Sequence, residues 1–345
     1  MATVVIAIGA IADSFAAGHD LIGLVQPGAD GPSAEIFEKD FPDADLPPGL
    51  GHDGQQIYVI ARSPTDLDLL ESQLDDARYR LQRPLMPALG RLFYPPGSGD
   101  GLVIALVVVG ALSLFALGVA AGHLSLALGG GPWVAAIAPA LPGGYATFRL
   151  GLADNLALAL AVAALLAVER RRMGWAVVAA VGAVLAKEVM IVLFAARAVF
   201  GRSRVAVASM MLSGAVALGW FLMVRILVAR TDDFGELVVP FTGYVDSVDY
   251  WADGRGLVSL LTIAGAVTLT VAALVARGRR HPLFGPVLAF AAIAVLFSEN
   301  VVGPDFNGPR NIGPLLLLAI LMVATDPQPE SAPVHGSRSA TVELS

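Results

Sequence analysis

The sequence predicts an all-α integral membrane protein that crosses the bilayer about ten times and carries one large polar loop. The first observation behind this prediction is composition. Hydrophobic residues make up 56% of the 345 residues and charged residues only 15%, whereas about a quarter of an ordinary soluble domain is charged. A soluble chain of this size has no core that could hide so much apolar surface, so lipid has to cover the remainder.

The second observation is a succession of long apolar segments. A helix that crosses the hydrocarbon needs about 20 apolar residues, and none of these segments shows the charged stripe of a soluble amphipathic helix. The clear candidates are residues 101–128, 205–229, 257–276 and 283–302, and shorter ones are 132–148, 152–168 and 312–325. Residues 1–17 lack the basic start of a signal peptide, so we expect them to form an uncleaved first helix.

Arginine clusters predict the orientation of these helices. Short basic loops follow residues 169, 196 and 276, and such loops face the cytoplasm. Residues 174–200 lie between two of these clusters, with Lys187-Glu188 near their middle. Two short helices that meet at this charged pair satisfy the charge rule, while one long helix with an internal ion pair is the alternative. Counting two helices gives a bundle over residues 101–325 with both chain ends in the cytoplasm, and residues 326–345 read as a disordered cytoplasmic tail.

The loop over residues 18–100 is predicted to lie outside the cytoplasm and to hold the chemistry. It has fourteen acidic and six basic residues. His52, Asp53, Gly54 and Gln55 follow an irregular stretch rich in Pro and Gly. We expect Asp53 to lie in a loop, where the glycine after it lets backbone approach a ligand. Ser63-Pro64 is typical of a helix start, and Pro84 and Pro87 are expected to break that amphipathic helix.

Three arginines gather in this acidic loop. Arg78, Arg80 and Arg83 form a dense basic patch, and guanidinium groups suit phosphate oxygens. The alternative is that they pair with Glu71, Asp75 and Asp76 nearby.

Ionisable groups at membrane depth are functional candidates by default. Several of them fall at the end of their segments that faces the large loop, which indicates a polar cavity open to the outside; the full set is Arg149, Asp154, Lys187, Glu188, Arg225, Glu299 and Arg310. Snorkelling towards the interface is the alternative for Arg225.

Composition also excludes some functions. The net charge of −7 is unlike the basic footprint of a nucleic-acid-binding protein. The absence of cysteine excludes disulfides and thiolate metal sites. The dominance of Ala, Val, Leu and Gly over lysine is typical of a GC-rich bacterial genome, so we expect a multi-pass protein of the bacterial inner (plasma) membrane.

The order of these motifs resembles the GT-C superfamily of polytopic membrane glycosyltransferases, in particular short bacterial members linked to cell-surface glycopolymers. The resemblance covers the chain from the first helix to about residue 325, and its motifs are His52-Asp53-Gly54-Gln55, Asp76-x-Arg78-Tyr79-Arg80-x-Gln82-Arg83-Pro84, Ala153-Asp154-Asn155 and Leu185-Ala186-Lys187-Glu188. It implies a GT-C-like fold, a polyprenyl-phosphate sugar donor, a glycan, lipid or protein acceptor, and an inverting transfer on the extracytoplasmic side.

The resemblance also implies roles for individual residues. Asp53 becomes the expected general base, with Asp20 and Asp76 as alternatives. His52 and Gln55 would contact the sugar hydroxyls, and the cations expected at the phosphate are Arg78, Arg83, Lys187 and Arg310. The full substrate-binding set is His52, Gln55, Arg78, Arg83, Asp154, Lys187, Glu188 and Arg310. A divalent cation (Mg²⁺ or Mn²⁺) at the outer carboxylates is compatible with the resemblance, although no ligand spacing demands one.

Two other functions use the same features. A transporter or flippase for a lipid-linked or anionic substrate needs the same buried charges, but it gives no reason for the large outer loop. A non-catalytic scaffold of an envelope complex would explain the Asp-Gly-Gln sequence as a turn.

Overall fold

The computed structural model describes residues 1–16, 21–201, 203–228, 238–254 and 256–326, and the tail predicted to be disordered lies almost wholly outside them. The described residues form helices and turns without a β-strand, which confirms the all-α prediction. Four helices are long and apolar enough to cross a membrane, as expected of a membrane protein: α7 (Gly99–Ala127), α13 (Arg204–Leu227), α16 (Leu257–Arg277) and α19 (Asn307–Ala324).

Shorter helices complete the bundle, and several of them begin or end in its interior. α1 (Ala2–Ala16) packs against α8 (Val134–Ala140) and α9 (Pro142–Arg149). α10 (Asp154–Glu169) lies between α7 and α11 (Met173–Ala186). α12 (Ile191–Gly201) packs against α13 and α17 (Phe284–Ala294).

The predicted break at Lys187-Glu188 is confirmed. α11 ends at Ala186, Lys187 is extended with φ −157° and ψ 115°, and α12 begins at Ile191. Both helices pack against α13, so they form a hairpin with Lys187 and Glu188 at its tip. At 1.5 Å per residue the two arms are about 21 and 17 Å long, so each is shorter than the roughly 30 Å hydrocarbon core.

The single helix predicted over residues 283–302 is wrong. α17 ends at Ala294, and α18 (Glu299–Val302) follows after a turn. The carbonyl groups at this end accept hydrogen bonds from another segment: Val295 O from Phe241 N and Leu296 O from Val238 N, both at 2.7 Å. This pairing of backbone groups replaces the helical bonds that would continue α17.

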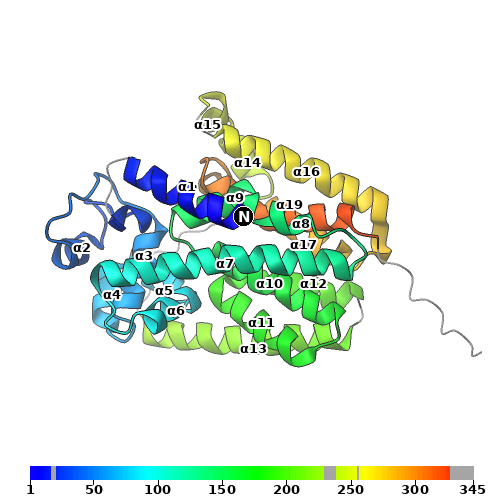
Figure 1. Cartoon of the computed structure of the whole chain (residues 1–345), viewed down its shortest axis with the longest axis horizontal. Coiled ribbons are helices and arrows are strands. Elements are labelled where there is room, and N and C mark those ends of the chain that lie inside the picture. The colour runs from blue at the N-terminus through cyan, green and yellow to red at the C-terminus, as the bar shows by residue number, and fades with distance from the viewer. Residues whose placement is uncertain (17–20, 202, 229–237, 255, 327–345) are drawn as a thin grey trace, which may run out of the picture.

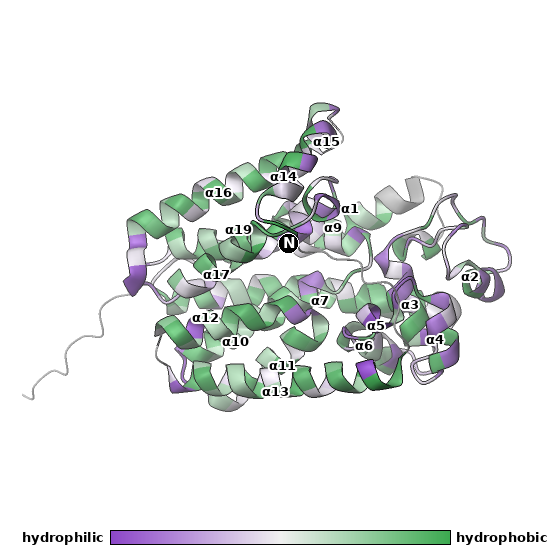
Figure 2. Ribbon diagram, turned by 180° about the vertical axis from the view of Figure 1, so that it is seen from behind, coloured by the Kyte–Doolittle hydropathy of each residue, from purple (hydrophilic) through white to green (hydrophobic). Residues whose placement is uncertain are grey.

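Residues 21–98 form a helical lobe at one end of the bundle (Figure 1). Its elements are a 3-10 turn (Leu21–Leu24), α2 (Ala34–Asp40), α3 (Asp53–Arg62), α4 (Leu67–Gln73), α5 (Ala77–Arg80) and α6 (Leu85–Phe93). Polar residues concentrate in this lobe and in the connections, whereas the long helices are apolar (Figure 2).

The predicted helix start at Ser63-Pro64 is also wrong. Ser63 follows the last residue of α3, and Asp66 caps α4 instead, because its carboxylate accepts a hydrogen bond from Leu69 N at 3.2 Å. The predicted amphipathic helix is interrupted before the prolines, because α4 ends at Gln73 and α5 ends at Arg80. Pro84 and Pro87 themselves do not break a helix. They occupy the cap and first turn of α6, where a missing N–H costs nothing.

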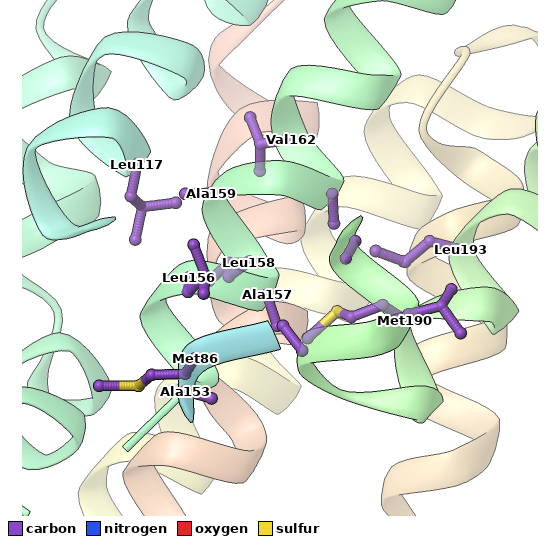
Figure 3. Close-up of a cluster of buried hydrophobic side chains, with 14 of the residues drawn as sticks. Met86, Leu117, Ala153, Leu156, Ala157, Leu158, Ala159, Val162, Met190 and Leu193 are labelled. Atoms are coloured by element: carbon purple, nitrogen blue, oxygen red, sulfur yellow. The ribbon is translucent and has the colours of Figure 1, made fainter. Parts of the chain in front are cut away.

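The lobe and the bundle share one hydrophobic core. Met86 of α6 lies beside Ala153 and Leu156 at the start of α10, and Leu117 of α7 packs on the same cluster (Figure 3). The indole nitrogen of Trp220 on α13 donates to Leu81 O at 2.8 Å. These contacts hold the lobe against the ends of the short helices α10 and α11, where the longer α7 and α13 extend past them.

Gly54 sets the distance between α3 and the bundle. A Cβ atom there would lie 2.3 Å from Leu150 O and 2.8 Å from Val25 O, both of them backbone atoms. We predict that Gly54→Ala lowers the free energy of unfolding by about 1–3 kcal/mol, as overpacking does elsewhere. The control is Gly265→Ala on α16, where no atom lies within 4 Å of the new Cβ. Equal thermal unfolding of both variants in detergent would contradict this account of the docking.

Candidate functional site

Asp53 lies where the lobe meets α19. One of its carboxylate oxygens is 2.9 Å from Nη2 of Arg80, and the other is 3.0 Å from Nη1 of Arg310. The Asp53 side chain is 29% exposed. Two helices that are more than 200 positions apart in the chain therefore supply the two cations that hold this carboxylate.

The local sequence explains why a carboxylate is tolerated here. The sequence suggested that Asp53 lies in an irregular loop, but it is the first residue of α3. The N-terminus of a helix favours negative charge. The glycine after Asp53 lets this turn approach the backbone of Leu150, while Gly143 similarly allows α9 to contact Pro309 and Arg310 of α19.

The charges around Asp53 keep it ionised. Burial raises the pKa of Asp53, but the positive charges of Arg310 and Arg80 outweigh burial and hold this pKa well below its usual range. Burial also lowers the pKa of His52, so its imidazole is neutral at pH 7 and can exchange hydrogen bonds with a ligand. Asp53 is thus an anion of weak basicity in this state of the site.

A second layer of ion pairs joins the lobe to the tip of the α11–α12 hairpin. Arg83 holds Glu188 through two bonds, Nε to Oε2 at 2.8 Å and Nη2 to Oε1 at 2.6 Å. The Arg83 guanidinium also lies 4.2 Å from the centre of the Tyr79 ring and donates to the Tyr79 hydroxyl. Such a fork-to-carboxylate contact fixes geometry as well as charge.

The hairpin tip is joined to two further helices by Lys187. Its ammonium group donates to Asp154 at the start of α10 and, at 2.9 Å, to Asn311 Oδ1 on α19. The side chains of Lys187 and Asp154 are only 12% and 14% exposed. Lobe, hairpin, α10 and α19 therefore converge on one polar centre.

A cavity of about 550 Å³, which includes the open space at its mouth, lies at this centre. Four cationic side chains line it, from α5, the segment after α5, the hairpin tip and α19. The full lining is Asp53, Gln56, Ile57, Ile60, Arg80, Arg83, Leu152, Ala153, Asp154, Ala186, Lys187, Arg310 and Asn311. We call it the cationic cavity.

A second cavity of about 670 Å³, again counting its open part, also has Asp53 in its lining. It shares Asp53, Gln56 and Arg310 with the cationic cavity, and its full lining is Pro32, Leu50, Gly51, His52, Asp53, Gln55, Gln56, Asp75, Leu150, Asn307 and Arg310. Gln55 and Gln56 are each only 2% exposed, and the amide oxygen of each has no hydrogen-bond partner. We call this the amide cavity.

The structure brings together most residues that the sequence singled out. Asp53, Arg83, Asp154, Lys187 and Arg310 line the cationic cavity. Glu188 joins them through Arg83, and His52 and Gln55 line the amide cavity.

Two predicted residues belong elsewhere, and a third is not placed. Asp76, the alternative base, caps α5 by accepting a hydrogen bond from Tyr79 N at 2.9 Å. Arg78, a predicted phosphate ligand, donates to Val228 O at 2.9 Å at the C-terminal end of α13, where a cation satisfies free carbonyl groups. Asp20 lies outside the described residues.

Sequence reasoning selected Arg78 and Arg83 from the basic patch and missed Arg80, Gln56 and Asn311. The available signal for Arg80 was its place in the basic patch, between Arg78 and Arg83 in the sequence. The expected pairing of the patch with nearby acids is confirmed in part, because Arg80 also holds Asp75 through two bonds at 2.8 and 2.6 Å.

The residues present do not fit a divalent cation. Within the part of the chain that the structure describes, no three His, Asp or Glu side chains gather as metal ligands. Arg80 lies between the carboxylates of Asp53 and Asp75 and contacts both. Arginine and lysine side chains are therefore the groups that can stabilise negative charge at this site.

Comparison with models of protein families, with curated proteins and with solved structures finds no match to this chain. The geometry of the two cavities is therefore the basis for the function proposed below.

The Arg83–Glu188 pair is predicted to couple the lobe energetically to the hairpin. Arg83→Gln and Glu188→Gln each leave a partner unpaired, so the double variant should recover stability relative to the sum of both losses. We expect an interaction energy of about 1–3 kcal/mol from a double-mutant cycle on thermal unfolding. A cycle of Arg62→Gln with Glu188→Gln is the control, because Arg62 pairs with Asp40 instead. Additive effects in both cycles would show that the pair contributes nothing to docking.

Proposed function

We propose that this chain is a membrane-embedded inverting glycosyltransferase of GT-C type. In this proposal it moves a sugar from a polyprenyl-phosphate donor to an envelope glycan, lipid or protein, with Asp53 as the general base. The observation that carries the proposal is the position of Asp53, a single carboxylate between a cavity lined by cations and a cavity lined by amide groups.

The cationic cavity suits the phosphate of such a donor. A sugar attached to phosphate already has a leaving group, and the negative charge that develops on departure needs preorganised cations. Arg80, Arg83, Lys187 and Arg310 supply them within one cavity. Leu152, Ala153 and Ala186 complete the wall with apolar groups at the ends of bundle helices, as a lipid-linked ligand requires.

The amide cavity suits the acceptor. The side-chain amides of Gln55 and Gln56 line it together with neutral His52, and side chains of these types hydrogen-bond hydroxyl groups. Asp53 borders this cavity as well, so it can remove the proton from an acceptor hydroxyl that enters there. One displacement at the anomeric carbon, with the hydroxyl and the phosphate on opposite faces, inverts its configuration.

The distribution of arginines supports an extracytoplasmic site in a bacterial inner membrane. Arg197 pairs with Glu169, and Arg277 donates to Val323 O. Arg277 is the last residue of α16, and this end of α16 lies opposite the lobe (Figure 1). Basic connections tend to face the cytoplasm, so in this proposal the lobe lies on the extracytoplasmic side. Ten passes result if α1, the α8–α9 pair, α10, the two hairpin arms and α17 each count as one crossing beside the four long helices.

The first test compares wild type with Asp53→Asn in nanodiscs, using polyprenyl-phosphate sugars as donors and a cell-envelope extract as acceptor. We expect wild type to consume a donor and the variant to lose about 10²–10⁴-fold in rate, as the loss of a general base does. Asp45→Asn, at an exposed carboxylate of the same lobe, should retain full activity. Donor that crosses vesicle membranes without bond cleavage would favour a flippase, and no turnover or transport would favour a scaffold.

Donor and acceptor binding should respond to different substitutions. The double variant Arg83→Gln with Glu188→Gln removes one cation together with its own partner, so we expect the KM for the donor to rise about tenfold or more through a lost charged hydrogen bond. Gln55 lines the amide cavity and not the cationic cavity, so Gln55→Leu should instead raise the KM for the acceptor and leave the donor KM unchanged. Steady-state kinetics with each substrate varied in turn checks this, and an identical response of both constants would contradict the assignment of the cavities.

A further inference from the structure

The cationic cavity holds no surplus of positive charge. Arg83 is paired with Glu188 and Lys187 with Asp154. Arg310 is paired with Asp53, and Arg80 with Asp53 and Asp75. Four cations therefore face four carboxylates, and an anion that enters must replace one of these carboxylates on its cation.

Asp53 is held less firmly than the other carboxylates. Glu188 and Asp75 each receive two bonds from a single guanidinium group, at 2.6 and 2.8 Å in both cases. Asp154 is nearly buried against Lys187. Asp53 receives only one bond from each of two arginines, at 2.9 and 3.0 Å, and single contacts are weaker and less specific than bidentate ones.

The Asp53 side chain can move from the cationic cavity into a second polar cavity. It borders the amide cavity as well as the cationic cavity, so it can leave both arginines without entering an apolar environment. Its removal would leave the guanidinium groups of Arg80 and Arg310, which both line the cationic cavity, without their shared carboxylate.

We propose that a phosphate group entering the cationic cavity replaces Asp53 as the partner of Arg80 and Arg310 and thereby releases Asp53 towards the amide cavity. Arg80 is then both a phosphate ligand and the positioning residue that restrains the base until the phosphate arrives. This inference rests on the proposed function in one respect, namely that the phosphate belongs to the donor.

The exchange changes the basicity of Asp53 in a direction set by charge. The charged and titratable groups around it are, in full, Arg80 and Arg83 from the lobe, Asp75 beside them, Arg310 from α19, Asp154 from α10, Lys187 from the hairpin tip, and His52 next to it in the chain. Loss of two direct arginine contacts and arrival of an anion both favour the protonated carboxyl group. Asp53 therefore becomes an effective base only when the donor phosphate is bound, which orders donor before acceptor.

The test measures the protonation of Asp53 directly and needs no sugar transfer. A carbodiimide reacts with protonated carboxyl groups, so the full chain in nanodiscs is labelled at pH 5 and Asp53 modification is quantified by mass spectrometry. The probe is undecaprenyl phosphate, and undecaprenol, which lacks the phosphate, is its control. At constant pH, a rise of one unit in the pKa of Asp53 increases its protonated fraction about tenfold. We therefore expect Asp53 labelling to rise about tenfold or more with undecaprenyl phosphate and to stay constant with undecaprenol.

Asp40 provides an internal control in the same sample. It is held by Arg62 at 2.6 Å in the same lobe but does not line either cavity around Asp53, so its labelling should not respond. Arg80→Lys should raise Asp53 labelling without any ligand, because the ammonium group cannot hold Asp53 and Asp75 together as the guanidinium fork does.

The outcomes separate this inference from the proposed function. Retention of radiolabelled undecaprenyl phosphate without a change at Asp53 would overturn the exchange and leave the glycosyltransferase proposal standing. A rise at Asp53 without sugar transfer in the earlier assay would support the exchange and count against the transferase. If the phosphate lipid does not bind, the exchange is refuted.

Discussion

The ion pair between Arg83 of the lobe and Glu188 at the hairpin tip is the contact on which the arrangement of the site depends. It connects a polar segment near the N-terminus to the centre of a helical bundle. A broken pair would leave a charge with little solvent, which is more costly than never having brought the two groups together. The geometry of α5, α11 and α12 is therefore coupled, and so are the positions of Arg80 and Lys187 on either side of the cavity.

The cationic cavity lies at the ends of the short helices α10 and α11. α11 and α12 stop at Lys187 and Glu188, and α10 begins at Asp154, whereas α7 and α13 continue alongside the lobe. Backbone that leaves a helix inside a membrane protein is tolerated only where protein or a polar cavity covers it. Here the lobe covers the ends of the short helices, so the polar residues at those ends face the lobe.

Charge balance gives the centre its chemical character. A cavity with four unpaired cations would be costly to desolvate, and one with paired cations is stable but resists anions. The site resolves this conflict because one carboxylate, Asp53, is shared by two arginines and borders a second polar cavity. The same feature that keeps the empty site stable can therefore link ligand binding to the release of a base.

The sequence by itself determined the class of protein and much of the candidate site. Apolar length and composition predict membrane helices because hydrocarbon imposes this requirement locally. The arginine clusters on both sides of residues 174–200 predict a helix break at Lys187-Glu188, because the segment has to return to the side from which it came. Tertiary structure alone decided the rest. Arg78 and Arg80 are alike in sequence, but α13 presents free carbonyls to Arg78 while Asp53 faces Arg80. The end of α17 and the amide cavity likewise depend on segments far apart in the chain, whose contacts no local pattern records.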